Sequence, residues 1–267
     1  VPELVIDMPI VDGQTNGVAA KWGALRKIGS GILQVTDTNT YTGGTVIDGG
    51  TLHVATLNAP AQTNLTAGFT ASPNLITFNQ PVAKNMILRQ RIGSASKTGF
   101  TDKRYVIEVL NDYQLVTDAV GAIGRPSDVY VEALSRSGSL GTAPVTVNAT
   151  GTLKIDPGIF MTNAIVVNAN GTINASGARI GSLAVTNGTV AVNVATGALV
   201  VSNNVSLSGA APTFAGTSFV THDAIVILSS STGITGRFSS IPDRTQIAYT
   251  PTSVILGKLR GLSIIVR

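Results

Sequence analysis

Short apolar segments separated by small polar residues recur along most of the chain. Ile32–Val35 and Thr45–Ile47 are rich in aliphatic and β-branched residues, and Thr51–Val54 follows directly after a pair of glycines. Segments of this length and composition predict β-strands, because they are too short for helices and their flanking residues favour turns. A chain that turns after every short strand is expected to wind into a solenoid.

One pattern of apolar, polar and glycine positions returns at a regular interval. The segment Val147–Leu153 aligns with Val167–Ile173, which predicts a coil of about twenty residues. Related versions of the pattern occur at Val46–Leu52, Val185–Val190 and Val194–Leu199. We therefore expect an all-β solenoid in which equivalent segments lie directly over one another, with Val, Ile, Leu and Ala filling the interior.

The composition changes in the middle of the chain. Charged residues, Phe and Tyr become more frequent there, and the apolar segments Tyr105–Leu110 and Tyr113–Val116 flank a turn typical of hairpins. We predict solenoid coils in residues 1–55, an inserted compact β domain in 56–139, and further solenoid coils in 140–267. Solenoids place insertions on one face, which is often the binding face.

Residues 25–54 resemble a known repeat. The spacing Lys27-x-Gly29-x-Gly31-x-Leu33-x-Val35, followed by Asn39–Thr45 and Gly50-Thr51-Leu52, is similar to the autotransporter-associated β-strand repeat of bacterial autotransporter passengers. The resemblance implies a right-handed parallel β-helix, secreted or on a bacterial cell surface, and a scaffold rather than a catalytic site.

The segment Ala224–Leu256 is similar to the closing coils of those passengers. In that family a membrane β-barrel follows. Here Leu262–Val266 predicts one more strand instead.

The composition limits the possible functions. Hydrophobic residues make up 43% of the chain and charged residues only 12%, and there is no cysteine, so we expect no disulfide and no thiolate chemistry. The net charge is +4, but the basic residues are scattered and do not form the concentrated patch of a nucleic-acid-binding protein. No run of eighteen apolar residues occurs, so we expect no transmembrane helix.

The reactive side chains are sparse and dispersed. His53 and His222 are the only histidines, and no nucleophile, zinc or phosphate-binding motif is present. We therefore predict no catalytic residue, no cofactor and no metal site. The enzymatic alternative is a β-helical polysaccharide-degrading enzyme. Its candidate catalytic carboxylates would be Asp7, Asp12, Asp37 and Asp48.

The inserted domain contains the candidates for partner binding. Tyrosine and arginine side chains anchor many interfaces when they are exposed. The alternative is that the tyrosines pack the core of the small domain and the charges only solvate it. The candidates are Arg89, Arg91, Lys103, Arg104, Tyr105, Tyr113 and Tyr130.

These observations together favour a non-enzymatic, extracellular structural protein. Both ends carry apolar strands, Leu4–Ile6 and Leu262–Val266, and an uncapped strand edge recruits another chain. We expect a homo-oligomer, layer or filament that displays the inserted domain. The alternative is an adhesin or glycan-binding module that binds a surface glycan or a host-surface partner through the insertion.

Overall fold

The structure is a computed structural model. It describes all residues except 1, 16–17, 20–22, 60, 70–73, 84–85, 87–88, 97–98, 119–128, 217–223, 241–244 and 259–267. The described residues form β-strands and no α-helix. They divide into two compact units, which we name for their sheets. The parallel unit comprises Val1–Thr56 and Ser137–Arg267, and the antiparallel unit comprises Leu57–Arg136.

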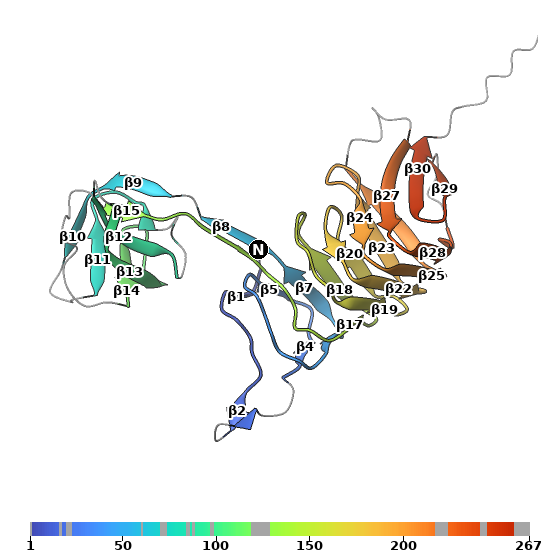
Figure 1. Cartoon of the computed structure of the whole chain (residues 1–267), viewed down its shortest axis with the longest axis horizontal. Helices are drawn as coiled ribbons and strands as arrows, with labels where there is room; N and C mark the ends of the chain where they lie inside the picture. Colours follow the sequence, from blue (N-terminus) through green and yellow to red (C-terminus); the bar gives the residue numbers. More distant parts are fainter. Residues whose placement is uncertain are drawn as a thin grey trace, which may run out of the picture. The chain divides into compact units, whose positions relative to one another are not determined.

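The parallel unit contains three β-sheets in which strands from successive coils lie side by side, compatible with a β-helix (Figure 1). The first follows the order β1 (Leu4–Ile6), β5 (Ile32–Val35), β7 (Gly50–Val54), β18 (Gly151–Ile155), β20 (Thr172–Asn174), β23 (Thr189–Asn193) and β26 (Ala211–Ala215). The second follows the order β4 (Leu25–Lys27), β6 (Thr45–Ile47), β17 (Val145–Val147), β19 (Ala164–Val167), β22 (Ser182–Thr186), β25 (Asn204–Ser208) and β28 (Gly233–Gly236).

The third sheet of this unit differs at one end. Its order is β21 (Arg179–Ile180), β24 (Leu199–Val201), β27 (Ala224–Ser230), β30 (Ser253–Lys258) and β29 (Thr245–Tyr249). The first three strands are parallel, but β30 pairs antiparallel with both β27 and β29. A hairpin therefore extends this sheet beyond the parallel stack. A short antiparallel pair, β2 (Gln14–Thr15) and β3 (Val18–Ala19), lies near the start of the chain.

Strand register confirms the stacking expected from the repeats. Val147 pairs with Val167, and Leu153 pairs with Ile173. Residues at the position of Leu153 in successive strands form an inward row in the first sheet. In spatial order the row is Leu4, Leu33, Leu52, Leu153, Ile173 and Val190. All but Leu4 are buried, and each such side chain contributes roughly 1.5–3 kcal/mol through removal from water.

Amide side chains connect the coils at one corner. Asn148 Nδ2 donates to Asp48 Oδ1 at 2.6 Å, and Asn168 Nδ2 donates to Asn148 Oδ1 at 2.8 Å. These hydrogen bonds join three successive coils where the chain turns between the second and first sheets. They explain why Asp and Asn occupy the polar positions of the repeat.

One part of the repeat alignment was wrong. Val185–Val190 turns from β22 in the second sheet to β23 in the first, as expected. Val194–Leu199, however, leads from β23 to β24 in the third sheet. A similar sequence therefore forms a different corner, because Gly, Asn and Thr suit tight turns at either corner.

The antiparallel unit contains one seven-stranded sheet. Its order is β10 (Ala67–Phe69), β11 (Leu75–Phe78), β14 (Gln114–Thr117), β13 (Gly99–Val109), β12 (Arg91–Ser96), β15 (Val129–Val131) and β9 (Gln62–Leu65). Ile76, Ile92 and Leu115 lie in its core. The expected hairpin forms between β13 and β14. A separate two-stranded sheet joins β8 (Thr56–Ala59) and β16 (Leu134–Ser137), where the chain passes between the units.

Most strands expected from the sequence are present. Ile32–Val35 and Thr45–Ile47 are β5 and β6 with those bounds, and Thr51–Val54 lies within β7. Leu262–Val266, expected as a last strand, lies outside the described residues.

Candidate binding sites

The structure brings some of the predicted partner-binding residues together and separates others. Arg91 on β12 is directly opposite Tyr105 on β13, and Arg89 lies just before β12. Tyr113 lies in the turn between β13 and β14, and Tyr130 lies on β15. Lys103 and Arg104 also belong to β13, but Arg104 is buried and the Lys103 side chain is outside the described part. The predicted set is therefore not one patch.

Two of these residues line a groove of about 580 Å³ within the antiparallel unit. We call it the Tyr105 groove. Its lining residues are Arg89, Tyr105, Ile107, Asp118, Leu134 and Arg136. The volume lies within the range of small-molecule sites, roughly 300–1,000 Å³.

Strand alternation places the apolar part of this groove on the surface. Along β13, Arg104 and Val106 are buried, whereas the intervening Tyr105 and Ile107 are 44% and 51% exposed. The core of the unit is built instead from the cluster around Ile76 and its neighbours. Tyr105 therefore does not serve as a core residue, and its ring is available at the surface.

Backbone contacts hold the groove in place. Tyr105 N donates to Asp118 Oδ1 at 2.7 Å, and Asp118 N donates to Tyr105 O at 3.0 Å. Arg89 N donates to Val106 O at 2.7 Å, with Arg89 at a φ of 66°. A left-handed conformation is uncommon for arginine and costs about 1 kcal/mol or more.

An ion pair lies beside the groove. Arg91 Nη2 donates to Glu132 Oε1 at 2.6 Å, and Arg91 Nε donates to Glu132 Oε2. Glu132, and to a smaller extent Tyr105, raise the pKa of the Arg91 guanidinium. Because this bidentate pair balances its own charge, it adds no net charge to the neighbouring surface.

The sequence analysis missed four residues of the Tyr105 groove. Ile107 could have been found from the sequence, because residues two apart in a strand, such as Tyr105 and Ile107, point to the same face. Asp118 follows β14, and Leu134 and Arg136 lie on β16. Their place in the groove depends on long-range pairing that no local pattern contains.

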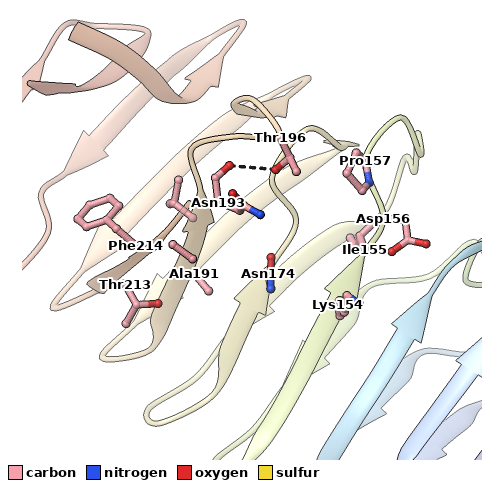
Figure 2. A pocket seen from close by; sticks show the side chains of 12 residues that line it. Lys154, Ile155, Asp156, Pro157, Asn174, Ala191, Asn193, Thr196, Thr213 and Phe214 are labelled. Atoms are coloured by element: carbon pink, nitrogen blue, oxygen red, sulfur yellow. Dashed lines mark hydrogen bonds between the residues drawn. The ribbon is translucent and has the colours of Figure 1, made fainter. Parts of the chain in front are cut away.

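A second, smaller groove lies on the parallel unit. It has a volume of about 330 Å³ and lies over the outward faces of β18, β20, β23 and β26. Figure 2 shows Lys154, Asn174, Ala191 and Thr213 on successive strands, with Thr196 Oγ1 donating to Asn193 O at 2.9 Å near the corner. The small Ala191 side chain leaves the depression between its neighbours.

Three of the four carboxylates proposed for an enzyme occupy structural positions. Asp12 accepts hydrogen bonds from Gly23 N and from Thr42, and the Thr42 bonds lower its pKa. Asp37 Oδ1 accepts from Thr38 N at 2.7 Å in a turn. Asp48 joins the corner amides, and its pKa is lowered by Asn148 first and Arg26 second. These three carboxylates thus stabilise corners, and Asp7 lies just after β1.

The histidines do not form a nucleophilic site in the described part. His53 Nε2 contacts Asp156 Oδ1 at 2.7 Å between adjacent coils, and Asp156 Oδ2 also accepts from Thr56 N. His222 lies outside the described residues. Within the described ranges, no group of three or more His, Cys, Asp or Glu side chains is placed to hold a metal ion. No helix among those residues has the length and apolarity needed to cross a membrane.

Comparison with known proteins adds one match. The family model described as passenger-associated-transport-repeat matches residues 25–54, which include β4, β5, β6 and β7. No curated protein matches the chain significantly. The match supports a β-helical protein similar to autotransporter passengers, which are secreted or exposed on the bacterial surface.

Proposed function

We propose that the chain is a non-enzymatic structural β-solenoid of a bacterial surface, wound right-handed, that associates end to end with further copies. In this proposal residues 57–136 form an inserted domain that the solenoid displays. The proposal rests on one observation above all: Leu4, at an inward position of the edge strand β1, is exposed.

Leu4 occupies an inward position but is exposed. It pairs in register with Leu33, whose side chain faces the core, yet Leu4 is 58% exposed because the structure describes no strand beyond β1 in that sheet. Other large apolar side chains at the same end are also exposed: Val5, Met8, Val11 and Ile28. Burial of such a surface against another copy would be favourable by about 25 cal/mol per Å².

The first sheet is better suited to this contact than the second. At the edge of the second sheet, β4 carries the buried Lys27, whose Nζ donates to Ile28 O and Gly29 O at 2.8 Å. An inward lysine protects a strand edge from pairing. We therefore assign the docking edge to β1, with β26 at the opposite end of the same sheet as its partner, although Pro212 on β26 supplies no backbone N–H to the contact.

Sedimentation velocity of the full chain tests the proposal. We expect the sedimentation coefficient to rise with concentration, because burial of the exposed apolar side chains favours association. Leu4→Lys should weaken association strongly. The control Val226→Lys changes a 40% exposed apolar residue on β27 and should leave association unchanged. Monomers at every concentration, or equal effects of the two substitutions, would contradict the proposal.

A further inference from the structure

The groove over β18, β20, β23 and β26 contains polar groups that the packing of the coils does not require. We call it the Ala191 groove; its volume is about 330 Å³. Lys154, Asn174, Ala191 and Thr213 pair in register, so they form one outward row across the four strands (Figure 2). At a strand spacing of about 4.8 Å, this row is about 14 Å long. A ligand that fills the groove is therefore extended along the stack.

The amide of Asn174 is not used by the fold. Its side chain is half-buried on the outward face of β20 and has no hydrogen-bond partner within the described ranges. The corner amides differ, since Asn168 Nδ2 donates to Asn148 Oδ1 across two coils. A free amide offers two N–H donors and a carbonyl acceptor to a ligand. Asn174 thus places both kinds of group in the groove.

Asn193 is held in position by its own backbone contacts. Its Oδ1 accepts from Ala195 N at 3.1 Å, its backbone N donates to Ser176 Oγ at 2.7 Å, and its backbone O accepts from Thr196 Oγ1 at 2.9 Å. Among the residues that the structure describes, Nδ2 has no partner. A donor that is already oriented loses less entropy on binding. Asn193 therefore presents fixed N–H donors beside the row.

The charge of the lining indicates a neutral ligand. One lysine and one aspartate line the groove, so their formal charges cancel. The carboxylate of Asp156 is already engaged, because Oδ1 contacts His53 Nε2 at 2.7 Å and Oδ2 accepts from Thr56 N at 3.2 Å. A groove without net charge does not attract a polyanion such as nucleic acid. The complementary ligand has many hydroxyl groups and no high charge density.

The position of the groove on the sheet argues against a peptide. A peptide that binds by strand addition needs a free sheet edge. The groove instead lies over a sheet face, and β18, β20 and β23 beneath it are each paired on both sides. The small side chain of Ala191 leaves room for the C–H face of a sugar ring between the polar side chains of its neighbours.

We propose that the Ala191 groove binds a neutral, hydroxyl-rich oligosaccharide that lies along the stack. Asn174 and Asn193 donate to sugar oxygens, Lys154 and Thr213 contact hydroxyl groups toward the two ends of the row, and a sugar ring lies over Ala191. All the lining residues belong to one copy of the parallel unit. The inference is therefore independent of end-to-end association.

NMR titration of the full chain tests the inference. Leu4→Lys serves as the background, so that association does not mask binding. The probes are tetrasaccharides of cellulose, chitin and mannan, each compared with its disaccharide and with tetragalacturonate. We expect saturable shifts of the Asn174 and Asn193 side-chain amide signals with at least one neutral probe. Its affinity should exceed that of its disaccharide about tenfold, because a shorter ligand makes fewer hydrogen bonds. Tetragalacturonate should bind no more tightly.

Three substitutions locate the site. Ala191→Ile fills the groove, removes no polar group and suits a strand, so it should weaken binding about tenfold or more. Asn174→Ala should weaken binding about tenfold. The matched control is Thr172→Ala, on the same strand and face but outside the groove, which should leave binding unchanged. Circular dichroism verifies that each variant folds.

Four results would overturn the inference. They are the absence of saturable binding by all three neutral tetrasaccharides, binding of tetragalacturonate alone, unchanged binding in Ala191→Ile, and an equal loss in Thr172→Ala and Asn174→Ala.

Discussion

The two units use opposite rules to pair their strands. In the parallel unit, Leu52 on β7 pairs with Leu153 on β18 although the whole antiparallel unit separates them in the chain. In the antiparallel unit, three of the six pairings in the seven-stranded sheet join strands that are neighbours in the sequence: β10–β11, β12–β13 and β13–β14. A repeated strand therefore selects its partner by its repeat, whereas an unrepeated strand depends more on the nearest turn.

The units also differ in how they treat polar groups. The parallel unit binds Asp48, Asn148 and Asn168 in one chain of hydrogen bonds along its corner. The antiparallel unit places arginines, Asp118 and exposed Tyr105 around a groove. Polar side chains thus stabilise the stack in one unit and form a candidate binding surface in the other.

Core substitutions should have the largest effect and should show whether the units unfold separately. Leu153→Ala removes a fully buried side chain of the inward row and should cost about 2–5 kcal/mol of unfolding free energy. Hydrogen exchange of the backbone amides of β18 and β20 follows the opening of the parallel unit. Ile76→Ala in the other core should leave the exchange of these amides in urea unchanged. Faster exchange of these amides in the Ile76→Ala variant would show that the units are coupled.

A glycine at a coil corner should have the next largest effect. Gly50 has a φ of +62°, and an added Cβ would lie 2.4 Å from Gly31 O and 2.5 Å from Gly29 O. Gly50→Ala should therefore destabilise the parallel unit by more than the roughly 1–2 kcal/mol of a left-handed conformation alone. At Gly158, with φ +82°, a Cβ would meet nothing within 4 Å, so Gly158→Ala should cost only the conformational part. Equal losses in thermal unfolding would contradict the packing argument.

The corner amides predict a smaller effect that depends on pH. Asn148→Ala should raise the pKa of Asp48 toward its ordinary value, because Asn148 is the main cause of its lowering. A carboxylate with a lowered pKa stabilises the fold above its unfolded-state pKa, and this contribution is lost as pH falls through the folded-state pKa. The variant should therefore lose less stability on acidification than the unchanged chain. An NMR titration showing no change in the Asp48 pKa would refute this assignment.

Tyr113 should show the smallest effect. It lies in the turn between β13 and β14 and is 46% exposed, outside the Tyr105 groove. Tyr113→Ala should change the unfolding free energy by no more than about 0.5 kcal/mol. A loss of about 2 kcal/mol or more in urea unfolding would contradict a surface role for this side chain.

Pairings between repeated strands could be predicted from the sequence, whereas long-range pairings between unrepeated strands could not. The stacking of Val147 on Val167 followed from the repeat, because identical spacing makes equivalent residues neighbours in space. The strands of the antiparallel unit were detectable, but the approach of Arg136 to Tyr105 was not, since it joins β16 to β13 without any repeat. The third-sheet corner at Val194–Leu199 was assigned wrongly because glycine-rich turns resemble one another.

Head-to-tail association can be tested directly by disulfide trapping, because the chain has no cysteine. Val5 and Thr213 are the first and last members of one outward row, whose successive members are Val5, Gln34, His53, Lys154, Asn174, Ala191 and Thr213. Continuing the sheet into another copy places Val5 beside Thr213 at the strand spacing of about 4.8 Å, within disulfide reach. When Val5→Cys and Thr213→Cys chains are mixed and oxidised, the account predicts mainly mixed dimers. Dimers formed mainly between identical variants would contradict it.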